Sequence, residues 1–149
     1  MVNKYNERFS ADTDGEKLNA IAYNANLFDP QGTPELLDNP QFKDFDLVAV
    51  GFGFHHFEDL PMVTTRLVER LKPGGVLMIL DFYSHDKDDL GADPASMTIA
   101  HHGFSEAMIK GLFGRAGLTG CQVLDFGQDV FIKGHAVRRP FLATGKKPV

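Results

Sequence analysis

The sequence has 149 residues, of which 43% are hydrophobic and 23% charged, enough for the core of one soluble globular domain over residues 1–149. Its net charge of -5 argues against nucleic acid as a partner, because phosphate contacts need clustered lysines and arginines. A single cysteine, Cys121, excludes an internal disulfide and is expected to be a small buried hydrophobe. No apolar run approaches the roughly 20 residues of a membrane span, and the N-terminus lacks a secretory signal. We therefore expect a cytoplasmic protein without a membrane partner.

The N-terminal part of the sequence predicts little regular structure. Residues 2–9 can form a short helix. Residues 18–27 are a candidate strand flanked by asparagines, because most of its first residues are apolar: Leu18, Ala20, Ile21, Ala22 and Tyr23. The polar stretch after them contains prolines and glycine, which favour a loop.

The stretch from Phe45 to Phe82 predicts a strand, a helix and a second strand. Leu47 to Val50 is a continuous apolar run, typical of a strand that is buried on both faces. Val76 to Leu80 is a second such run, which Asp81 ends. Two buried strands joined by one helix run parallel, through a right-handed crossover.

The helix between these strands has its own start and stop signals. Asp59 can cap it, and Pro61 falls in its first turn, where a missing N–H is harmless. Residues 73–75, Pro-Gly-Gly, are predicted to end it. Its apolar positions recur at helical spacing: Leu60, Val63, Leu67 and Leu71.

The C-terminal part predicts one more helix and a pair of strands. Ser105 is expected to cap the helix and Gly117 to end it. Residues 121–126 and 140–144 are predicted to be closing antiparallel strands, with residues 127–139 as a long hairpin loop.

Two segments, FDLVAVGFGFHHFED from residue 45 and LKPGGVLMILDF from residue 71, closely resemble the second half of class I S-adenosylmethionine-dependent methyltransferases. Within this family they look like the small-molecule group that includes quinone-biosynthesis methyltransferases. The resemblance implies an α/β fold with a Rossmann-like sheet, in which parallel strands 4 and 5 precede a C-terminal antiparallel hairpin. It also implies S-adenosylmethionine as cofactor and a small molecule as substrate. Because residues 1–6 look like the helix after the family's second strand, we expect a truncated sheet without strands 1 and 2.

The family's cofactor motif is missing from this sequence. The family binds S-adenosylmethionine through a glycine-rich turn after its first strand and an acidic residue that ends its second strand, much as in dinucleotide sites. The only G-x-G here, residues 51–53, follows a different strand and has His56 at the third glycine position. Asn26 is the nearest match to the family's adenine-binding Asp, but it accepts a hydrogen bond without charge assistance. We therefore expect impaired or absent cofactor binding, with these candidate contacts: Asn26, Leu27, Gly51 and Phe52.

The missing strands also predict an interface. In the family, strand four pairs with strand one, so the strand at residues 45–50 is left with an open edge of unpaired N–H and C=O groups. Either residues 18–27 pair along this edge, or a second copy of the chain does. A homodimer through the edge at residues 45–50 is the prediction.

Histidines are the candidate catalytic residues. His55 and His56 follow a parallel strand at its C-terminal end, where ligands bind in open α/β sheets. An imidazole exchanges a proton near neutral pH, so either residue can act as a general base; the alternative is a cap or a loop contact. No metal is expected, since adjacent histidines on an extended segment point apart. The candidate substrate contacts are Phe54, Asp81, Tyr83, His85, His101 and His102. Core packing is the alternative for Phe54, and capping or solvating the loop is the alternative for Asp81.

Three functions are compatible with these residues. The first is a small-molecule methyltransferase with His55 or His56 as its base. The second is an isomerase or cyclase that has lost the cofactor and kept the pocket, and the third is a non-catalytic fragment or binding partner. In each case the loop from Ser84 to Ala100 is expected to cover the pocket.

Overall fold

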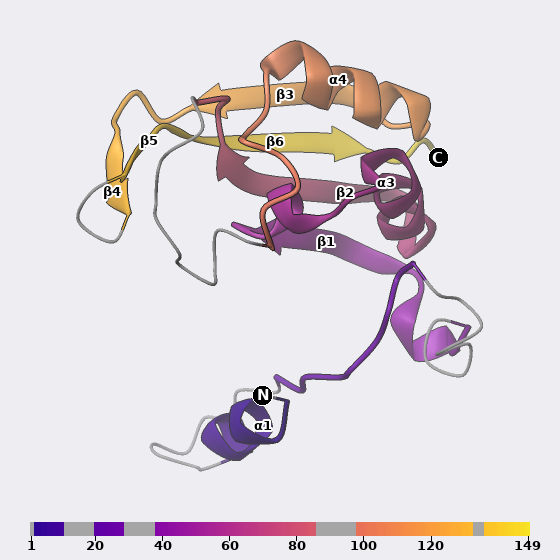
Figure 1. The fold of residues 1–149 in the computed structure, drawn as a ribbon. Coiled ribbons are helices and arrows are strands. Elements are labelled where there is room, and N and C mark those ends of the chain that lie inside the picture. The colour runs from indigo at the N-terminus through magenta and orange to yellow at the C-terminus, as the bar shows by residue number, and fades with distance from the viewer. Residues whose placement is uncertain (1, 11–19, 29–37, 86–97, 133–135) are drawn as a thin grey trace. The chain divides into compact units, whose positions relative to one another are not determined.

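A computed structural model describes residues 2–10, 20–28, 38–85, 98–132 and 136–149 (Figure 1). The chain divides into two compact units, Met1–Asp38 and Asn39–Val149. The prediction of a single domain over residues 1–149 stays a prediction. Within the described ranges, no helix is both long and apolar enough to cross a membrane.

The first unit contains the helix α1, Val2–Ser10, and so confirms the predicted N-terminal helix. The candidate strand at residues 18–27 is wrong where the structure describes it, because residues 20–28 form no strand. The Asn6 side chain donates to Ala22 O (3.0 Å) and accepts from Ala22 N (2.7 Å). A side chain thus occupies both backbone groups of Ala22, and they are not available to a strand ladder.

The second unit is built on a four-stranded sheet in the order β1-β2-β6-β3 (Figure 1). Strands β1 (Phe45–Gly51) and β2 (Leu71–Phe82) run parallel, as predicted. Strand β6 (Pro140–Lys146) runs antiparallel to both β2 and β3 (Thr119–Asp125), which confirms the closing antiparallel strands. The result is a mixed α/β sheet of the methyltransferase type.

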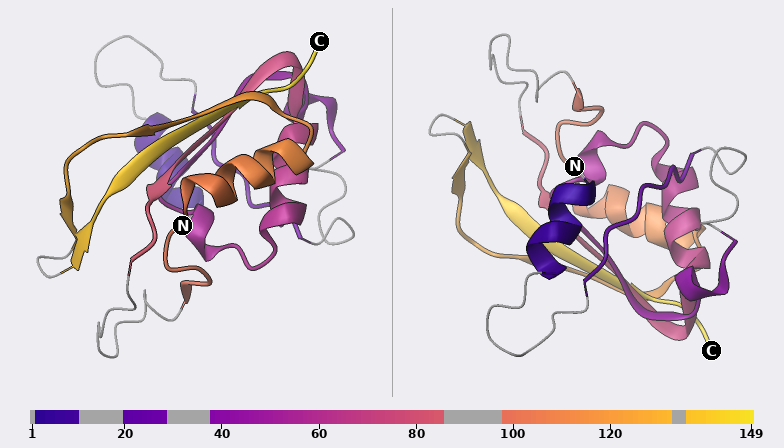
Figure 2. Two further views of the ribbon diagram at one scale, coloured as in Figure 1. Left: turned by 90° about the horizontal axis from the view of Figure 1, so that it is seen from above. Right: turned by 90° about the horizontal axis from the view of Figure 1, so that it is seen from below.

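Two helices cover one face of this sheet (Figure 2). Helix α3 (Leu60–Glu69) begins at the predicted cap, where Met62 N donates to Asp59 Oδ1 at 2.9 Å. Helix α4 spans Glu106–Arg115, and Ser105 caps it as predicted, since Met108 N donates to Ser105 Oγ. Leu77 and Ile79 of β2 are fully buried against this layer, so the core of the unit lies between the sheet and the two helices.

The end of α3 differs from the prediction. The Pro-Gly-Gly stretch was expected to end the helix, but strand β2 already begins at Leu71 and contains it. Arg70 O accepts from Phe45 N at 2.9 Å, so the chain joins β1 immediately after the helix. A Cβ on Gly75 would lie 2.7 Å from Phe45 O, so glycine is needed there for close approach of two strands.

Strand β1 is less buried than predicted. Its apolar run was expected to be buried on both faces, yet Leu47 is 51% exposed. In the described sheet β1 is an edge strand, and α3 and α4 lie on the same face, so no described helix of this unit covers the other face of β1. The apolar run correctly predicts a strand but not how deeply the strand is buried.

The second unit also contains short elements. Two of these are the 3₁₀ turns η1 (Pro40–Phe42) and η2 (Phe54–His56). The predicted hairpin loop at residues 127–139 contains a two-stranded ribbon, β4 (Val130–Ile132) and β5 (Ala136–Arg138). Phe131 on this ribbon is 73% exposed.

We predict that Leu77→Ala lowers the free energy of unfolding by about 2–5 kcal/mol, because truncating a buried leucine leaves a cavity in the layer between sheet and helices. Leu47→Ala, on the neighbouring strand and half exposed, is the matched control and should cost much less. Urea unfolding followed by circular dichroism measures both. Equal losses would contradict the placement of the core.

Candidate active site

The candidate site lies at the C-terminal ends of β1 and β2, which meet at one edge of the sheet (Figure 1). We call it the histidine rim and define it as η2, residues 82–85 and residues 98–104. The third segment is tied to the first, because Ala100 N and His101 N both donate to His55 O, at 3.1 and 3.0 Å. It is tied to the second through Ser84 N, which donates to Phe104 O at 3.1 Å. Residues 86–97 of the predicted cover lie outside the described residues.

Asp81, the penultimate residue of β2, is fully buried and makes hydrogen bonds through both carboxylate oxygens. Oδ2 accepts from the backbone N–H groups of Phe54 (3.0 Å) and His55 (3.2 Å). Oδ1 accepts from Phe82 N at 2.8 Å and lies 2.8 Å from His55 Nδ1. The structure places Asp81 beneath the rim and bonded to protein groups, which agrees with its alternative of capping the loop. A substrate contact of Asp81 stays a prediction.

His55 is oriented by this carboxylate. A carboxylate accepts hydrogen bonds and does not donate them, so Nδ1 of His55 carries the proton in the contact with Asp81 Oδ1. In the neutral ring Nε2 then keeps its lone pair. The side chain is 13% exposed, so the ring is partly accessible at the rim.

His56 is held in a similar way by a different group. Its Nδ1 lies 2.8 Å from the backbone O of Thr98, an acceptor, so Nδ1 is again the donor. The rings of His55 and His56 lie 4.2 Å apart between centroids. The structure therefore brings together the two predicted catalytic residues, each with Nδ1 engaged by an acceptor.

Aromatic rings flank the pair. Phe52 is 46% exposed and has a φ of 50°, a left-handed conformation that is rare for a bulky residue. Its ring stacks on Phe82 at 4.9 Å, and Phe82 lies 6.3 Å from the His55 ring. Phe54 is fully buried against Phe104, which agrees with its core-packing alternative.

Sequence reasoning did not single out Phe82 or Thr98. Alternation along β2 was the available signal for Phe82, because its neighbour Asp81 faces the helices and Phe82 must face the other way. No sequence signal pointed to Thr98, since its shorter contact with His56 Nδ1, at 2.8 Å, is made by a backbone oxygen; Thr98 Oγ1 lies 3.2 Å from the same nitrogen.

The remaining substrate candidates lie in the other two segments of the rim. Tyr83 packs on Phe141, and burial raises the pKa of its hydroxyl, with the Asp125 carboxylate as the next cause. His85 N donates to His102 O at 3.1 Å, and the two rings are 5.7 Å apart. His101 Nε2 is buried and has no hydrogen-bond partner in the described part of the chain. These side chains lie in the same rim as the predicted catalytic pair, His55 and His56.

The cofactor candidates fall in different units. Gly51 and Phe52 lie at the mouth of β1, where a Cβ on Gly51 would meet nothing within 4 Å. Asn26 and Leu27 belong to the first unit, where Asn26 Oδ1 accepts from Phe28 N at 3.0 Å.

Two other kinds of chemical site find no support. Among the described residues, no group of three or more His, Cys, Asp or Glu side chains could hold a metal ion. Burial raises the pKa of the Cys121 thiol, which disfavours the reactive thiolate.

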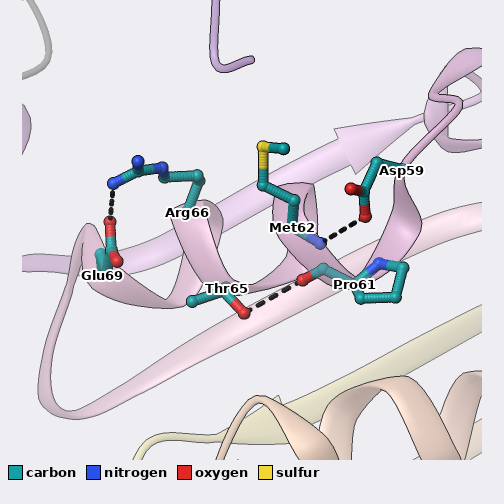
Figure 3. A pocket seen from close by; sticks show the side chains of 6 residues that line it. All are labelled: Asp59, Pro61, Met62, Thr65, Arg66 and Glu69. Atoms are coloured by element: carbon teal, nitrogen blue, oxygen red, sulfur yellow. Dashed lines mark hydrogen bonds and ion pairs between the residues drawn. The ribbon is translucent and has the colours of Figure 1, made fainter. Parts of the chain in front are cut away.

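A shallow hollow of about 430 Å³ lies away from the rim, on the exposed side of α3 (Figure 3). Its polar side chains are bonded within the helix itself: Arg66 to Glu69, Thr65 to Pro61 O, and Asp59 to Met62 N. None of these contacts indicates a ligand.

The family described as the ubiE/COQ5 methyltransferase family matches residues 14–93 of the chain. This chain belongs to that family. It is 34% identical over 136 residues to an uncharacterized methyltransferase, C1347.09, of Schizosaccharomyces pombe. The match covers 86% of this chain and 45% of the yeast protein, so the chain spans less than half the length of this curated relative.

Solved structures share the fold. A SAM-dependent methyltransferase from Methanosarcina mazei superposes with a TM-score of 0.64 at 12% identity, covering 99% of this chain and 77% of its own. Phosphoethanolamine N-methyltransferase 2 of Haemonchus contortus, solved in complex with S-adenosyl-L-methionine, gives 0.52 at 14% identity over 70% of this chain and 34% of its own. At these identities the likeness establishes the fold alone.

The family implies S-adenosylmethionine, and the described residues fit this cofactor only in part. The backbone at Gly51 is open to close approach, and the exposed Phe52 ring stands beside it. Among the described residues, the G-x-G at residues 51–53 stands at the end of β1, and it has His56 in place of the third glycine of the family's cofactor turn.

We predict that Tyr83→Phe reduces the loss of stability at alkaline pH. The raised pKa of Tyr83 means that the folded state favours the neutral phenol. Its stabilising effect is complete below the ordinary tyrosine pKa of about 10 and is lost as the pH rises through the higher folded value. Urea midpoints measured between neutral pH and about pH 11 test this, with Tyr5→Phe in the first unit as control. Identical alkaline profiles for wild type and Tyr83→Phe would contradict it.

Proposed function

We propose that this chain acts in a small-molecule methyltransferase, with the histidine rim as the place where substrate is bound and deprotonated. The observation that carries the proposal is the pair of imidazoles at the ends of the parallel strands. His55 is fixed through Nδ1 by a buried carboxylate, which leaves Nε2 to accept a proton. Family membership supports the enzyme class. A cytoplasmic location stays a prediction.

The chemistry divides between cofactor and rim. When bound, S-adenosylmethionine supplies an electrophilic methyl group. The chain's own residues hold the substrate and take the proton that its nucleophilic atom loses as the new bond to carbon forms. His55 is favoured as the acceptor over His56, because its partner is a carboxylate that stabilises the resulting imidazolium, whereas the partner of His56 is a neutral carbonyl.

The aromatic rings support a small organic substrate. Phe52 is exposed beside Phe82, and the Phe82 ring lies 6.3 Å from the His55 ring, so an apolar group can pack on the phenyl rings while its acidic atom meets the imidazole. Nucleic acid does not suit a chain with a net charge of -5.

The second candidate is a cofactor-free isomerase or cyclase, with a non-catalytic binding partner as the third. The partial fit to the cofactor favours these alternatives, because the rim's hydrogen bonds come from residues 54–56, 81–85 and 98–104 and do not depend on a glycine-rich turn. We propose that S-adenosylmethionine binding by this chain alone is impaired, since the backbone contacts that preorganise such a site are missing from its sequence.

We predict a dissociation constant for S-adenosylmethionine of about 1 mM or weaker, measured by titration calorimetry of the 149-residue chain. A micromolar constant would refute impaired binding and support an independent methyltransferase. No heat and no thermal shift at millimolar cofactor would refute methyl transfer by this chain alone and favour the cofactor-free candidates. Phe52→Ala is the matched variant. If the cofactor binds weakly at the mouth of β1, the binding heat should be smaller in Phe52→Ala than in the wild type.

We further propose that the chain forms a homodimer through the edge of β1. In the described sheet β1 pairs only with β2, so its outer backbone groups have no strand partner. Leu47 is exposed on this strand. A second copy that pairs along the edge would satisfy both the backbone groups and the apolar side chain.

Sedimentation velocity tests this interface. We expect a wild-type dimer, and a monomer for Leu47→Glu, because a buried charge would oppose the association. Leu124→Glu on β3, at the opposite edge of the same sheet, is the matched control and should remain dimeric, since Leu124 is 57% exposed but outside the interface. A monomeric wild type, or dissociation by Leu124→Glu alone, would refute the β1 interface.

A further inference from the structure

We infer that Asp81 is the positioning residue of the rim: its carboxylate sets both the backbone of η2 and the tautomer of His55, so that Nε2 is the basic nitrogen. This inference rests on the proposed function and specifies how its proton acceptor is prepared. It replaces a direct substrate contact for Asp81 with an action through His55.

The two oxygens of Asp81 have separate tasks. Oδ2 receives the backbone N–H groups of Phe54 and His55 and so fixes the first turn after β1. Oδ1 receives the ring N–H of His55 at 2.8 Å and the N–H of Phe82 at 2.8 Å. The buried Asp81 carboxylate therefore fixes both the backbone position of His55 and the orientation of its ring.

Because Asp81 is buried, its carboxylate depends on hydrogen bonds from the protein. Asp81 has no exposed surface, and a carboxylate removed from water needs hydrogen bonds to replace its solvation. Three backbone donors and one imidazole provide them. Since a carboxylate has only acceptors to offer, the ring must present its protonated nitrogen, and the other tautomer would place a lone pair against an anion.

The other side of His55 is restrained independently. His55 O accepts from Ala100 N and His101 N, which ties the η2 backbone to the third segment of the rim. The centroid of the His55 ring lies 4.2 Å from that of His56 and 6.3 Å from that of Phe82. With the backbone and Nδ1 of His55 held by hydrogen bonds, Nε2 is the ring nitrogen left to accept a proton.

His56 is the built-in comparison. Its Nδ1 also faces an acceptor, but this acceptor is the backbone O of Thr98, which no change at Asp81 removes. The two adjacent histidines thus depend on different groups, and a substitution of Asp81 should affect the tautomer of one and spare the other.

The test is the tautomer of each histidine, read by nitrogen-15 NMR of histidine-labelled protein at a pH where the rings are neutral. We expect His55 to be protonated at Nδ1 and not at Nε2, with its signals assigned by their loss in His55→Gln. This wild-type measurement needs no cofactor and no substrate. A His55 protonated at Nε2 would overturn the inference.

Asp81→Asn is the matched variant, because it keeps the shape of the side chain and replaces one acceptor oxygen by a donor. With the new amide nitrogen at the place of Oδ1, the substituted side chain would donate to the His55 ring, and Nε2 would become the protonated nitrogen. We expect this tautomer shift at His55 with His56 unchanged. An unchanged His55 tautomer in a folded Asp81→Asn protein would also overturn the inference.

Failure of the inference and failure of the proposed function give different results. If the wild-type tautomer is as expected but His55→Gln leaves methyl transfer by the holoenzyme unchanged, the positioning stands and the catalytic role of His55 falls. If His55→Gln removes transfer, we expect a loss of about 10²- to 10⁴-fold in kcat, the usual contribution of a general base. Asp81→Asn should then lower kcat, with little change in KM.

Discussion

The rim depends on one buried carboxylate at the end of the central strand. Asp81 joins the last residues of β2 to the turn that follows β1, through hydrogen bonds to Phe54 N, His55 N and Phe82 N. Parallel strands bring their C-terminal ends to the same edge of a sheet, but they do not orient the loops that follow. The carboxylate does so here, and the same oxygen that holds Phe82 N also holds the imidazole. The Asp81 side chain therefore both orients the turn after β1 and holds the His55 ring.

Much of the fold could be predicted from the sequence, because its signals are local. The caps at Asp59 and Ser105 and the apolar runs of β1 and β2 were found where predicted, since each depends on a few adjacent residues. The errors came from non-local contacts. The predicted strand at residues 18–27 failed because the Asn6 side chain takes both backbone groups of Ala22. The burial of β1 was overestimated because an apolar run reveals nothing about its place in the strand order.

The candidate site shows the same division. Chain order sufficed to place His55 and His56 at the mouth of a strand, and Asp81 at the end of the next one. Their relation could not be read from sequence, because Asp81 and His55 are 26 residues apart and their contact depends on strand register. The contact of His56 with Thr98 O was less accessible still, since any residue type offers the same backbone oxygen.

The rim is a self-contained structure within the family's fold. Its hydrogen bonds link η2, Asp81, residues 82–85 and residues 98–104, and none of them is made by the candidate cofactor contacts Asn26, Leu27, Gly51 or Phe52. The proposed proton acceptance and the proposed weak cofactor binding therefore rest on different residues. A methyltransferase that loses its cofactor contacts would keep an oriented imidazole beside the half-buried ring of Phe82, on which the exposed Phe52 stacks. The same Asp81–His55 pair would then serve either of the two leading candidate functions, and cofactor binding would decide between them.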